Sequence, residues 1–208
     1  MPGFEYLTVS IAGGKRVEAT ETRSLVLKLQ DGSLDALGGL YDRFNRLVFK
    51  TALGVTGDPD VASDLLQEVF LRLFRFARRI DPSRPLEPWL YRMTLNLSYT
   101  WVKRRKWAQP LEDISEWLAG DGKSQPSVMA EQREAWDFVE RALSRLPLAQ
   151  RTVIVLYYID ECSLQEIAKI LRIPPGTVKS RLHYARHTLK EYMRSQEQLV
   201  KGLNFEFT

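Results

Sequence analysis

Apolar side chains recur every three or four positions from Leu25 to about residue 194. This spacing places them on one face of successive amphipathic helices. No stretch shows the convincing alternation of apolar and polar residues that is typical of a half-buried strand. The pattern therefore predicts an all-α protein.

The first half of the chain divides into three predicted helices. The first helix is expected to end, and the second to begin, at residues 57–60. A proline lies near the start of the second helix, and Asp60 is its candidate cap. Three prolines between residues 82 and 88 precede a third helix, which begins at Trp89 and ends near Lys106. The inner faces of the first two helices are expected to carry Leu37, Leu40, Tyr41, Phe44, Leu47 and Val48, and then Ala62, Leu65, Leu66, Val69, Phe70, Leu73 and Phe74.

The second half of the chain has the layout of a helix-turn-helix domain. Four helices are predicted near residues 129–144, 148–159, 163–171 and 175–194. Ser163 followed by Glu166 fits a capping box at the start of the third of these helices. A short helix, a tight turn at residues 174–176 and a longer helix then follow one another, which is the order of a helix-turn-helix.

These elements predict two small helical domains joined by an acidic flexible linker. Glycines, prolines and acidic residues between the two periodic stretches favour a linker there. The expected divisions are an N-terminal extension at 1–22, a first domain at 23–108, the linker at 109–127, the helix-turn-helix domain at 128–194 and a tail at 195–208.

The composition is that of an ordinary globular protein. Of the 208 residues, 44% are hydrophobic and 27% are charged, which excludes collagen-like and low-complexity classes. The single cysteine, Cys162, permits no internal disulfide and suits a reducing cytosol. No apolar stretch approaches the roughly 18 residues of a membrane helix, and the N-terminus does not have the pattern of a signal peptide. We therefore expect a cytoplasmic protein.

The net charge of +4 is unevenly distributed along the chain. Residues 84–109 carry a net charge of +5, residues 110–142 carry −5, and residues 143–208 carry +4. Two basic segments on either side of an acidic one suggest two modules that face a polyanion and a connector that the polyanion repels. A solvated charged surface would have the same pattern, so the charge alone does not decide between these interpretations.

The last predicted helix combines an apolar face with a polar, cationic one. Its inward positions are Val178, Leu182, Ala185 and Leu189, and its outward positions are Thr177, Lys179, Ser180, Arg181, His183, Tyr184 and Arg186. Hydrogen-bonding and cationic side chains of this kind suit base edges and phosphates in a major groove. A purely structural helix pair does not require this mixture.

The residues of both domains resemble the extracytoplasmic-function (ECF, group IV) sigma factors, which are initiation subunits of bacterial RNA polymerase. The resemblance lies in Leu40-Tyr41-Asp42, Ala62 to Phe70, Trp89-Leu90-Tyr91-Arg92 and Asn96, and then in Leu146-Pro147, Gln150-Arg151, Glu166-Ile167-Ala168, Ile173-Pro174 and Gly176 to Leu182. It covers about residues 25–194 as two blocks in the family's order.

The resemblance implies a role for each block. The helix with Asp64, Gln67, Glu68 and Arg72 would dock on the clamp helices of the largest subunit of core RNA polymerase. The helix that begins at Trp89 would recognise and melt the minus-10 promoter element, with Asn96, Tyr99, Thr100, Trp101, Lys103, Arg104, Arg105 and Lys106 at the DNA. The outward face of the last helix, from Thr177 to Arg186, would recognise the minus-35 element.

Two residues depart from the family's pattern, and several features have plainer interpretations. Thr100 stands where an acidic or amide residue is usual, and Tyr184 where a basic one is, which predicts an altered promoter preference.

Trp89 is expected to be a packing residue. The acidic linker either occupies a basic channel of the polymerase or is only a spacer.

The sequence predicts no enzyme, no cofactor and no metal site. His183 and His187 lie one helical turn apart, but no third ligand is evident. The alternative function is a free-standing helix-turn-helix regulator that acts without core polymerase. The first block favours the sigma factor, because a free-standing regulator has no need for a polymerase-docking helix. The resemblance also implies an anti-sigma factor as a partner and no membrane insertion.

Overall fold

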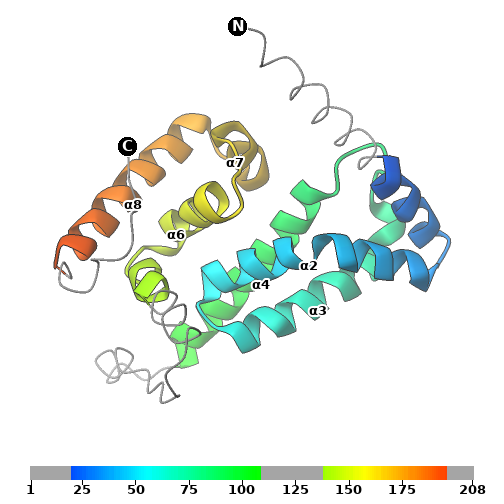
Figure 1. Cartoon of the computed structure of the whole chain (residues 1–208), viewed down its shortest axis with the longest axis horizontal. Coiled ribbons are helices and arrows are strands. Elements are labelled where there is room, and N and C mark those ends of the chain that lie inside the picture. The colour runs from blue at the N-terminus through cyan, green and yellow to red at the C-terminus, as the bar shows by residue number, and fades with distance from the viewer. Residues whose placement is uncertain (1–19, 109–137, 196–208) are drawn as a thin grey trace, which may run out of the picture.

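The computed structural model describes residues 20–108 and 138–195, and these residues form helices connected by short turns (Figure 1). No strand occurs within either of these two ranges. The prediction of an all-α fold with two helical domains is therefore confirmed. We refer to the described residues up to 108 as the N-terminal domain and to residues 138–195 as the C-terminal domain.

The N-terminal domain is built on three long helices packed side by side. It comprises a helix at 20–30, α2 (Leu34–Thr56), α3 (Pro59–Phe76), the 3₁₀ turn η1 (Ala77–Arg79) and α4 (Glu87–Ala108). Helices α2, α3 and α4 contact one another pairwise. Leu40, Val69 and Leu90, one from each helix, are completely buried between them, so burial of apolar surface holds the three helices together.

The connection between α2 and α3 is set by two local signals. Gly57 adopts a left-handed backbone conformation with φ of +72°, and its N–H donates to the Leu53 carbonyl oxygen, which ends α2. The Asp58 carboxylate then accepts hydrogen bonds from the N–H groups of Asp60 and Val61, both at 3.1 Å. The cap of α3 is therefore Asp58 and not Asp60, because Pro59 already occupies the first helical position.

The C-terminal domain contains the predicted helix-turn-helix. Its elements are a helix that is described from residue 138 to residue 144, α6 (Leu148–Ile154), the π-helical turn η3 (Val155–Ile159), α7 (Leu164–Leu171) and α8 (Pro175–Ser195). The predicted capping box at the start of α7 is present, with reciprocal hydrogen bonds between Ser163 and Glu166. Arg172, at φ of 55°, ends α7 in a left-handed conformation.

The structure also differs from the sequence predictions at three further places. The expected single helix over 148–159 is interrupted by η3. Tyr41 and Phe74, expected on inner helix faces, are 39% and 40% exposed. Phe74 follows the buried Leu73 and therefore points about 100° away from it around the axis of α3.

Several predicted segments lie largely outside the described residues. These are the linker at 109–127, most of the N-terminal extension at 1–22 and the tail at 195–208 except Ser195. The last three residues of the predicted extension, 20–22, are described and are helical. Within the part of the chain that the structure describes, no helix is long and apolar enough to cross a membrane.

The two domains pack directly against each other through an interdomain cluster of apolar side chains. Its members include Val55, Tyr91 and Leu95 from the N-terminal domain and Val153, Val155, Leu156 and Ile167 from the C-terminal domain. Gly54 of α2 makes the closest approach, since a Cβ atom added there would lie 2.8 Å from Val155 and 3.3 Å from Ile159. Only glycine at this position lets η3 approach α2 so closely.

A partly buried carboxyl group joins the domains next to this contact. Thr51 Oγ1 lies 2.8 Å from the Leu47 carbonyl oxygen of its own helix and 2.8 Å from Asp160 Oδ2 across the interface. The Thr51 hydroxyl has one hydrogen, which it donates to one of these two oxygens at a time. Burial raises the pKa of Asp160 to about 7, against smaller lowering effects of the Thr51 hydrogen bond and the charge of Lys50.

We predict that Asp160 makes the free energy of unfolding depend on pH. The folded chain keeps a proton on Asp160 that the unfolded chain releases above its ordinary pKa of 3.8, so stability falls as the pH rises from about 4 to about 7. The slope is at most about 1.4 kcal/mol per pH unit. Asp160→Asn retains an oxygen that accepts from Thr51 but does not ionise. Urea unfolding across this pH range should show a smaller fall for the variant, and parallel curves for the two proteins would contradict the assignment.

Candidate nucleic-acid interface

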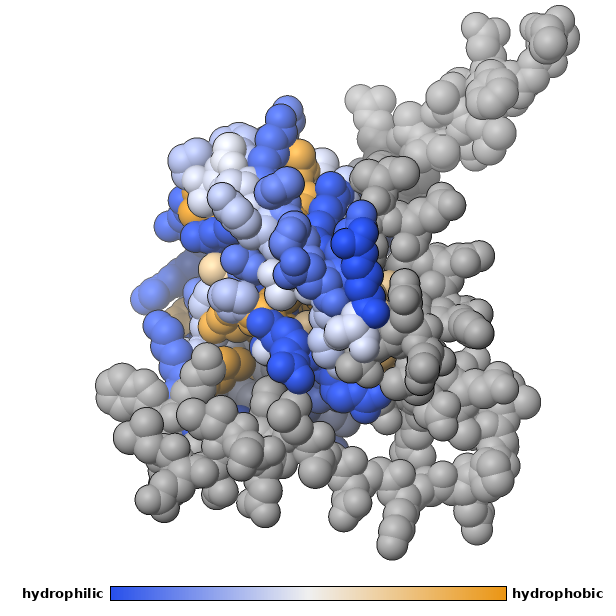
Figure 2. All heavy atoms as spheres, turned by 90° about the vertical axis from the view of Figure 1, so that its left-hand side faces the viewer, coloured by the Kyte–Doolittle hydropathy of each residue, from blue (hydrophilic) through white to orange (hydrophobic). Residues whose placement is uncertain are grey.

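Helix α8 is divided lengthwise into a buried and an exposed face. Val178, Leu182, Ala185 and Leu189 are each at most 6% exposed and pack into the interdomain cluster and the core beneath α8. Figure 2 views the molecule from the side on which α8 lies in Figure 1 and shows mainly hydrophilic side chains there. The apolar face positions the helix, which leaves the polar face available to a partner.

The predicted minus-35 residues all belong to α8. Lys179, Ser180, His183 and Tyr184 are exposed, whereas Thr177, Arg181 and Arg186 are partly buried. The Ser180 hydroxyl donates to the Thr177 carbonyl oxygen at 3.0 Å, and Tyr184 is 62% exposed. The structure thus brings the seven side chains together on one helix, in the arrangement that the sequence predicted for a groove-binding surface.

Arg186 is held by two tyrosines that the sequence analysis did not single out. Its guanidinium carbon lies 5.5 Å from the ring centre of Tyr157 and 5.6 Å from that of Tyr158. Its Nε also donates to the Tyr158 hydroxyl at 2.8 Å. These contacts orient a flexible cation before it meets any partner. Both tyrosines lie in η3, in an apolar run that gives no separate signal for this role.

The second half of α4 presents exposed polar and cationic side chains. Asn96, Thr100, Lys103 and Arg104 are exposed on this helix. The Thr100 hydroxyl donates to the Asn96 carbonyl oxygen at 2.8 Å, so the residue that departs from the family's pattern forms a hydrogen bond within its own helix. These four residues lie on the helix that the sequence analysis expected, and their contact with DNA stays a prediction.

Trp101 and Arg105 are less exposed and are engaged with each other. The Arg105 guanidinium carbon lies 5.1 Å from the ring centre of Trp101, and Arg105 also forms an ion pair with Asp58 at 3.7 Å. Arg105 therefore links the end of α4 to the cap of α3. Lys106 belongs to α4, but its side chain lies outside the described part of the structure.

Tyr99 does not lie on an open surface. Its hydroxyl oxygen is 2.7 Å from Thr152 Oγ1 of the C-terminal domain, and its ring packs against the interdomain cluster. Burial raises the pKa of Tyr99, while the Thr152 hydrogen bond and the positive charge of Arg181 lower it. The structure therefore places a predicted minus-10 residue at the boundary with the C-terminal domain.

The predicted polymerase-docking residues lie on the outer side of α3. Asp64 and Gln67 are exposed, and the partly buried Glu68 and Arg72 form an ion pair one turn apart. Leu71 beside them is 59% exposed. The sequence analysis did not single out Leu71, because one exposed apolar residue on a helix is ordinary and gives no signal by itself.

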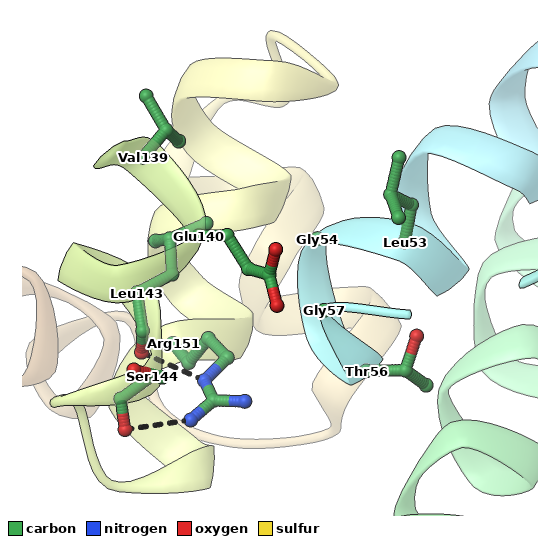
Figure 3. A pocket seen from close by; sticks show the side chains of 9 residues that line it. All are labelled: Leu53, Gly54, Thr56, Gly57, Val139, Glu140, Leu143, Ser144 and Arg151. Atoms are coloured by element: carbon green, nitrogen blue, oxygen red, sulfur yellow. Dashed lines mark hydrogen bonds between the residues drawn. The ribbon is translucent and has the colours of Figure 1, made fainter. Parts of the chain in front are cut away.

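The described residues contain little that could hold a metal or a cofactor. In the two described ranges, no three His, Cys, Asp or Glu side chains are grouped so that they could hold a metal ion. His187 instead approaches Glu191 at 3.5 Å. A cavity between α2 and the start of the C-terminal domain has a volume of about 20 Å³, which is the space of one water molecule (Figure 3).

Comparison with known families matches both domains. Sigma-70 region 2 matches residues 40–108, and Sigma-70 region 4 matches residues 139–189. The chain is 30% identical to the ECF RNA polymerase sigma factor SigW of Bacillus subtilis over 179 residues, which are 81% of this chain and 95% of SigW. It is 33% identical to the ECF RNA polymerase sigma factor SigL of Mycobacterium tuberculosis over 154 residues, which are 73% of this chain and 85% of SigL.

Solved structures share the fold at lower identity. CnrH, in complex with the cytosolic domain of CnrY, has a TM-score of 0.66 at 22% identity and covers 84% of this chain and 98% of its own. The sigma factor RpoE of Bartonella quintana, in complex with the anti-sigma factor NepR, has a TM-score of 0.60 at 22% identity and covers 76% and 96%. With both regions matched in order and a relative of 30% identity aligned over most of its length, this chain belongs to the ECF family of RNA polymerase sigma factors.

Proposed function

We propose that this sigma factor, when bound to core RNA polymerase, recognises the minus-35 element with α8 and opens and holds the minus-10 element with α4. The observation that carries the proposal is the lengthwise division of α8, whose polar face lies opposite a buried apolar stripe in the segment that matches region 4. A helix divided in this way enters a major groove without disturbing the domain that positions it.

The α8 surface offers both base and phosphate contacts. Arg181 and Lys179 suit guanine edges or phosphates, and Ser180 suits either kind of acceptor or donor. Arg186, restrained by its two tyrosines, is suited to a phosphate because its remaining N–H groups are presented in a fixed geometry. Tyr184 adds an aromatic surface where relatives usually have a cation, and this supports a different promoter preference.

The α4 surface suits a strand that has been opened. Lys103 and Arg104 provide exposed positive charge for the backbone, and the Trp101 ring offers a stacking surface for a base. Asn96 offers a side-chain donor and acceptor one turn before Thr100. Tyr99 is a further stacking candidate only after the C-terminal domain has moved away from it.

The outer side of α3 supports docking on the clamp helices of the core polymerase. Asp64, Gln67, Glu68 and Arg72 would supply polar contacts and Leu71 an apolar one. Under this proposal residues 23–108 and 128–194 act as the two DNA-contacting domains, and residues 109–127 connect them inside the polymerase. A protein with this role works in the cytoplasm, where the polymerase is.

An anti-sigma factor is a further proposed partner. CnrH and RpoE are similar in fold to this chain, and each was solved in complex with another protein, RpoE with an anti-sigma factor. A protein of that kind would hold this sigma factor away from core polymerase. The family is not an enzyme class, so the proposed activity is specificity for promoters and not catalysis.

Transcription with purified components tests the function. We expect the chain to co-elute with core RNA polymerase and to permit initiation from upstream sequences, selected from a library, that core alone ignores. Core without the chain and the chain without core are the controls. Tight and selective binding of duplex DNA by the chain alone, without any initiation in the presence of core, would favour the free-standing regulator instead.

Replacing Arg181 should weaken discrimination at the minus-35 element. We expect Arg181→Ala to reduce the preference of the holoenzyme for its best minus-35 sequence by about 1–3 kcal/mol, because one base contact is lost. The measurement is competitive initiation from promoters that differ only in that element. Lys190→Ala is the matched control, since Lys190 is exposed later in the same helix and outside the predicted set. Equal losses in the two variants would contradict a specific role for Arg181.

Removing the exposed cations of α4 should change the salt dependence of promoter binding. We expect the double variant Lys103→Ala and Arg104→Ala to reduce the slope of log affinity against log salt by about 1.4–1.8, since each lost phosphate contact contributes about 0.7–0.9. The control is Arg23→Ala with Lys28→Ala, which removes two exposed cations from the 20–30 helix. An unchanged slope in the α4 variant would remove these residues from the DNA interface.

A further inference from the structure

The turn that joins α3 to α4, at residues 77–86, is fixed at its tip by contacts within itself. The Asp81 carboxylate accepts hydrogen bonds from the N–H and the hydroxyl group of Ser83, at 2.9 and 2.6 Å. It also forms an ion pair with Arg84 at 3.1 Å. The hydrogen bonds from Ser83, together with the charge of Arg84, lower the pKa of this carboxyl group. The tip therefore has a defined shape.

A side chain from outside the turn holds its base. The Nε2 atom of Gln30, at the end of the helix at 20–30, donates to the carbonyl oxygens of Ala77 at 3.1 Å and of Ile80 at 2.7 Å. An amide nitrogen carries two hydrogens, so both bonds form at the same time. In Figure 1 this helix, in dark blue, lies at the end of the domain where the chain passes from α3 to α4. Gln30 thus ties the point at which the chain leaves η1 for an extended course.

This tie comes from a part of the chain that precedes the matched segment. The match to Sigma-70 region 2 begins at residue 40, ten residues after Gln30. The helix that carries Gln30 is itself firmly packed, since its Val26 and Leu29 are each 2% exposed and belong to one apolar cluster with Ile80. It can therefore hold the turn in place.

The turn determines where α4 starts. The N–H groups of Trp89 and Leu90 both donate to the carbonyl oxygen of Leu86, the last residue of the turn, at 3.0 Å. Because a helix rises 1.5 Å per residue, Lys103 lies about 24 Å beyond Glu87, and a tilt of about 5° at the first turn would shift it by about 2 Å. Recognition requires side chains to be held to within about 0.5 Å. The conformation of the turn therefore affects how α4 presents its polar side chains.

We propose that Gln30 is a positioning residue for minus-10 recognition, which fixes the course of α4 by holding the turn at 77–86. The inference rests on the proposed function of α4. Gln30 contacts neither promoter nor polymerase in this role, and it acts through the backbone carbonyl groups to which it donates. A helix that precedes the matched region 2 segment thereby contributes to promoter specificity.

Three variants separate the hydrogen bonds from the packing of the side chain. Gln30→Met keeps an unbranched side chain but has no donor. Gln30→Lys keeps N–H donors on a longer stem, and a cation beside the carbonyl groups at a helix end is favourable. Ser24→Met is the matched control, since it places the same methionine at an exposed position of the same helix. Thermal unfolding shows which variants are folded at the temperature of the assays.

The first measurement needs neither core polymerase nor DNA. We expect backbone amide hydrogen exchange over residues 77–86 of the free full chain to be at least fivefold faster in Gln30→Met than in wild type, because the base of the turn loses both of its ties. Gln30→Lys and Ser24→Met should exchange within twofold of wild type over the same residues.

The second measurement uses the holoenzyme and promoters selected with the wild-type chain. We expect Gln30→Met to lower the preference for the best minus-10 sequence at least fivefold in competitive initiation. Its affinity for core and its preference for the best minus-35 sequence should stay within twofold of wild type, since the outer side of α3 and the polar face of α8 are unchanged. Gln30→Lys and Ser24→Met should keep the minus-10 preference within twofold.

Four results would overturn the proposal. Unchanged exchange in Gln30→Met would mean that Gln30 does not hold the turn. Faster exchange with an unaltered minus-10 preference would mean that the two bonds only stabilise the domain. Equal losses in Gln30→Met and Gln30→Lys would mean that the donated hydrogen bonds are not the cause. An equal loss of minus-35 preference would mean a general defect.

Failure of the proposed function gives a different result. A wild-type holoenzyme that initiates at no promoter would contradict the function proposed for α4 and α8. The exchange comparison is made on the free chain, so it still reports whether Gln30 holds the turn. The two failures are therefore distinguishable.

Discussion

The close approach of η3 to α2 is the constraint on which the arrangement of the molecule depends. At Gly54 the side chains of Val155 and Ile159 lie so close to the backbone of α2 that not even a Cβ atom fits between them. This approach brings Val55 of α2 into the same apolar cluster as Val153 and Leu156. The polar groups around the cluster then lie within hydrogen-bonding distance. Thr51 bonds to Asp160, and Arg151 bonds to the carbonyl oxygen of Val55 at the end of α2. Hydrophobic burial and hydrogen bonding therefore act at one boundary and support each other.

Structure and recognition share the same helices in this protein. The apolar half of α8 belongs to the core, and its polar half is the proposed groove-binding surface. In α4 the cations themselves fall into two groups. Arg105 forms an ion pair with Asp58 and stacks on Trp101, while Lys103 and Arg104 are exposed. Positive charge at the end of α4 also favours the helix itself. A basic run can therefore contain residues with different roles, and only the packing distinguishes them.

Periodicity predicted the helices of both domains because each one buries a continuous apolar stripe. The capping box at Ser163 was predictable from sequence because both of its partners lie within one helical turn. The position of Phe74 was not, since its place in the apolar pattern does not reveal where the buried stripe of α3 ends. The outward face of α8 was predicted from periodicity and residue chemistry, and the family resemblance added its minus-35 role. The polymerase-docking set was found through the resemblance alone.

The interdomain features were beyond prediction from the sequence for a physical reason. Thr51 and Asp160 are 109 positions apart, and neither residue type signals a buried pair by itself. Arg151 stands between Gln150 and Thr152, just before an apolar run, and this context does not reveal the carbonyl groups that it binds. Gly54 is a single glycine in a helical pattern, which is the strongest of these signals because such a glycine costs the helix stability unless close packing requires it.

The number of residues in the π-helical turn η3 sets the orientation of the helices that follow it. A turn of this kind contains one residue more than a regular α-helix would use. Deleting a single residue from it would restore the ordinary winding and rotate everything that follows by about 100°. The helix-turn-helix would then meet α2 with a different side. Relatives that differ here by one amino acid are thus expected to dock their two halves in different orientations, even where the remaining residues are alike.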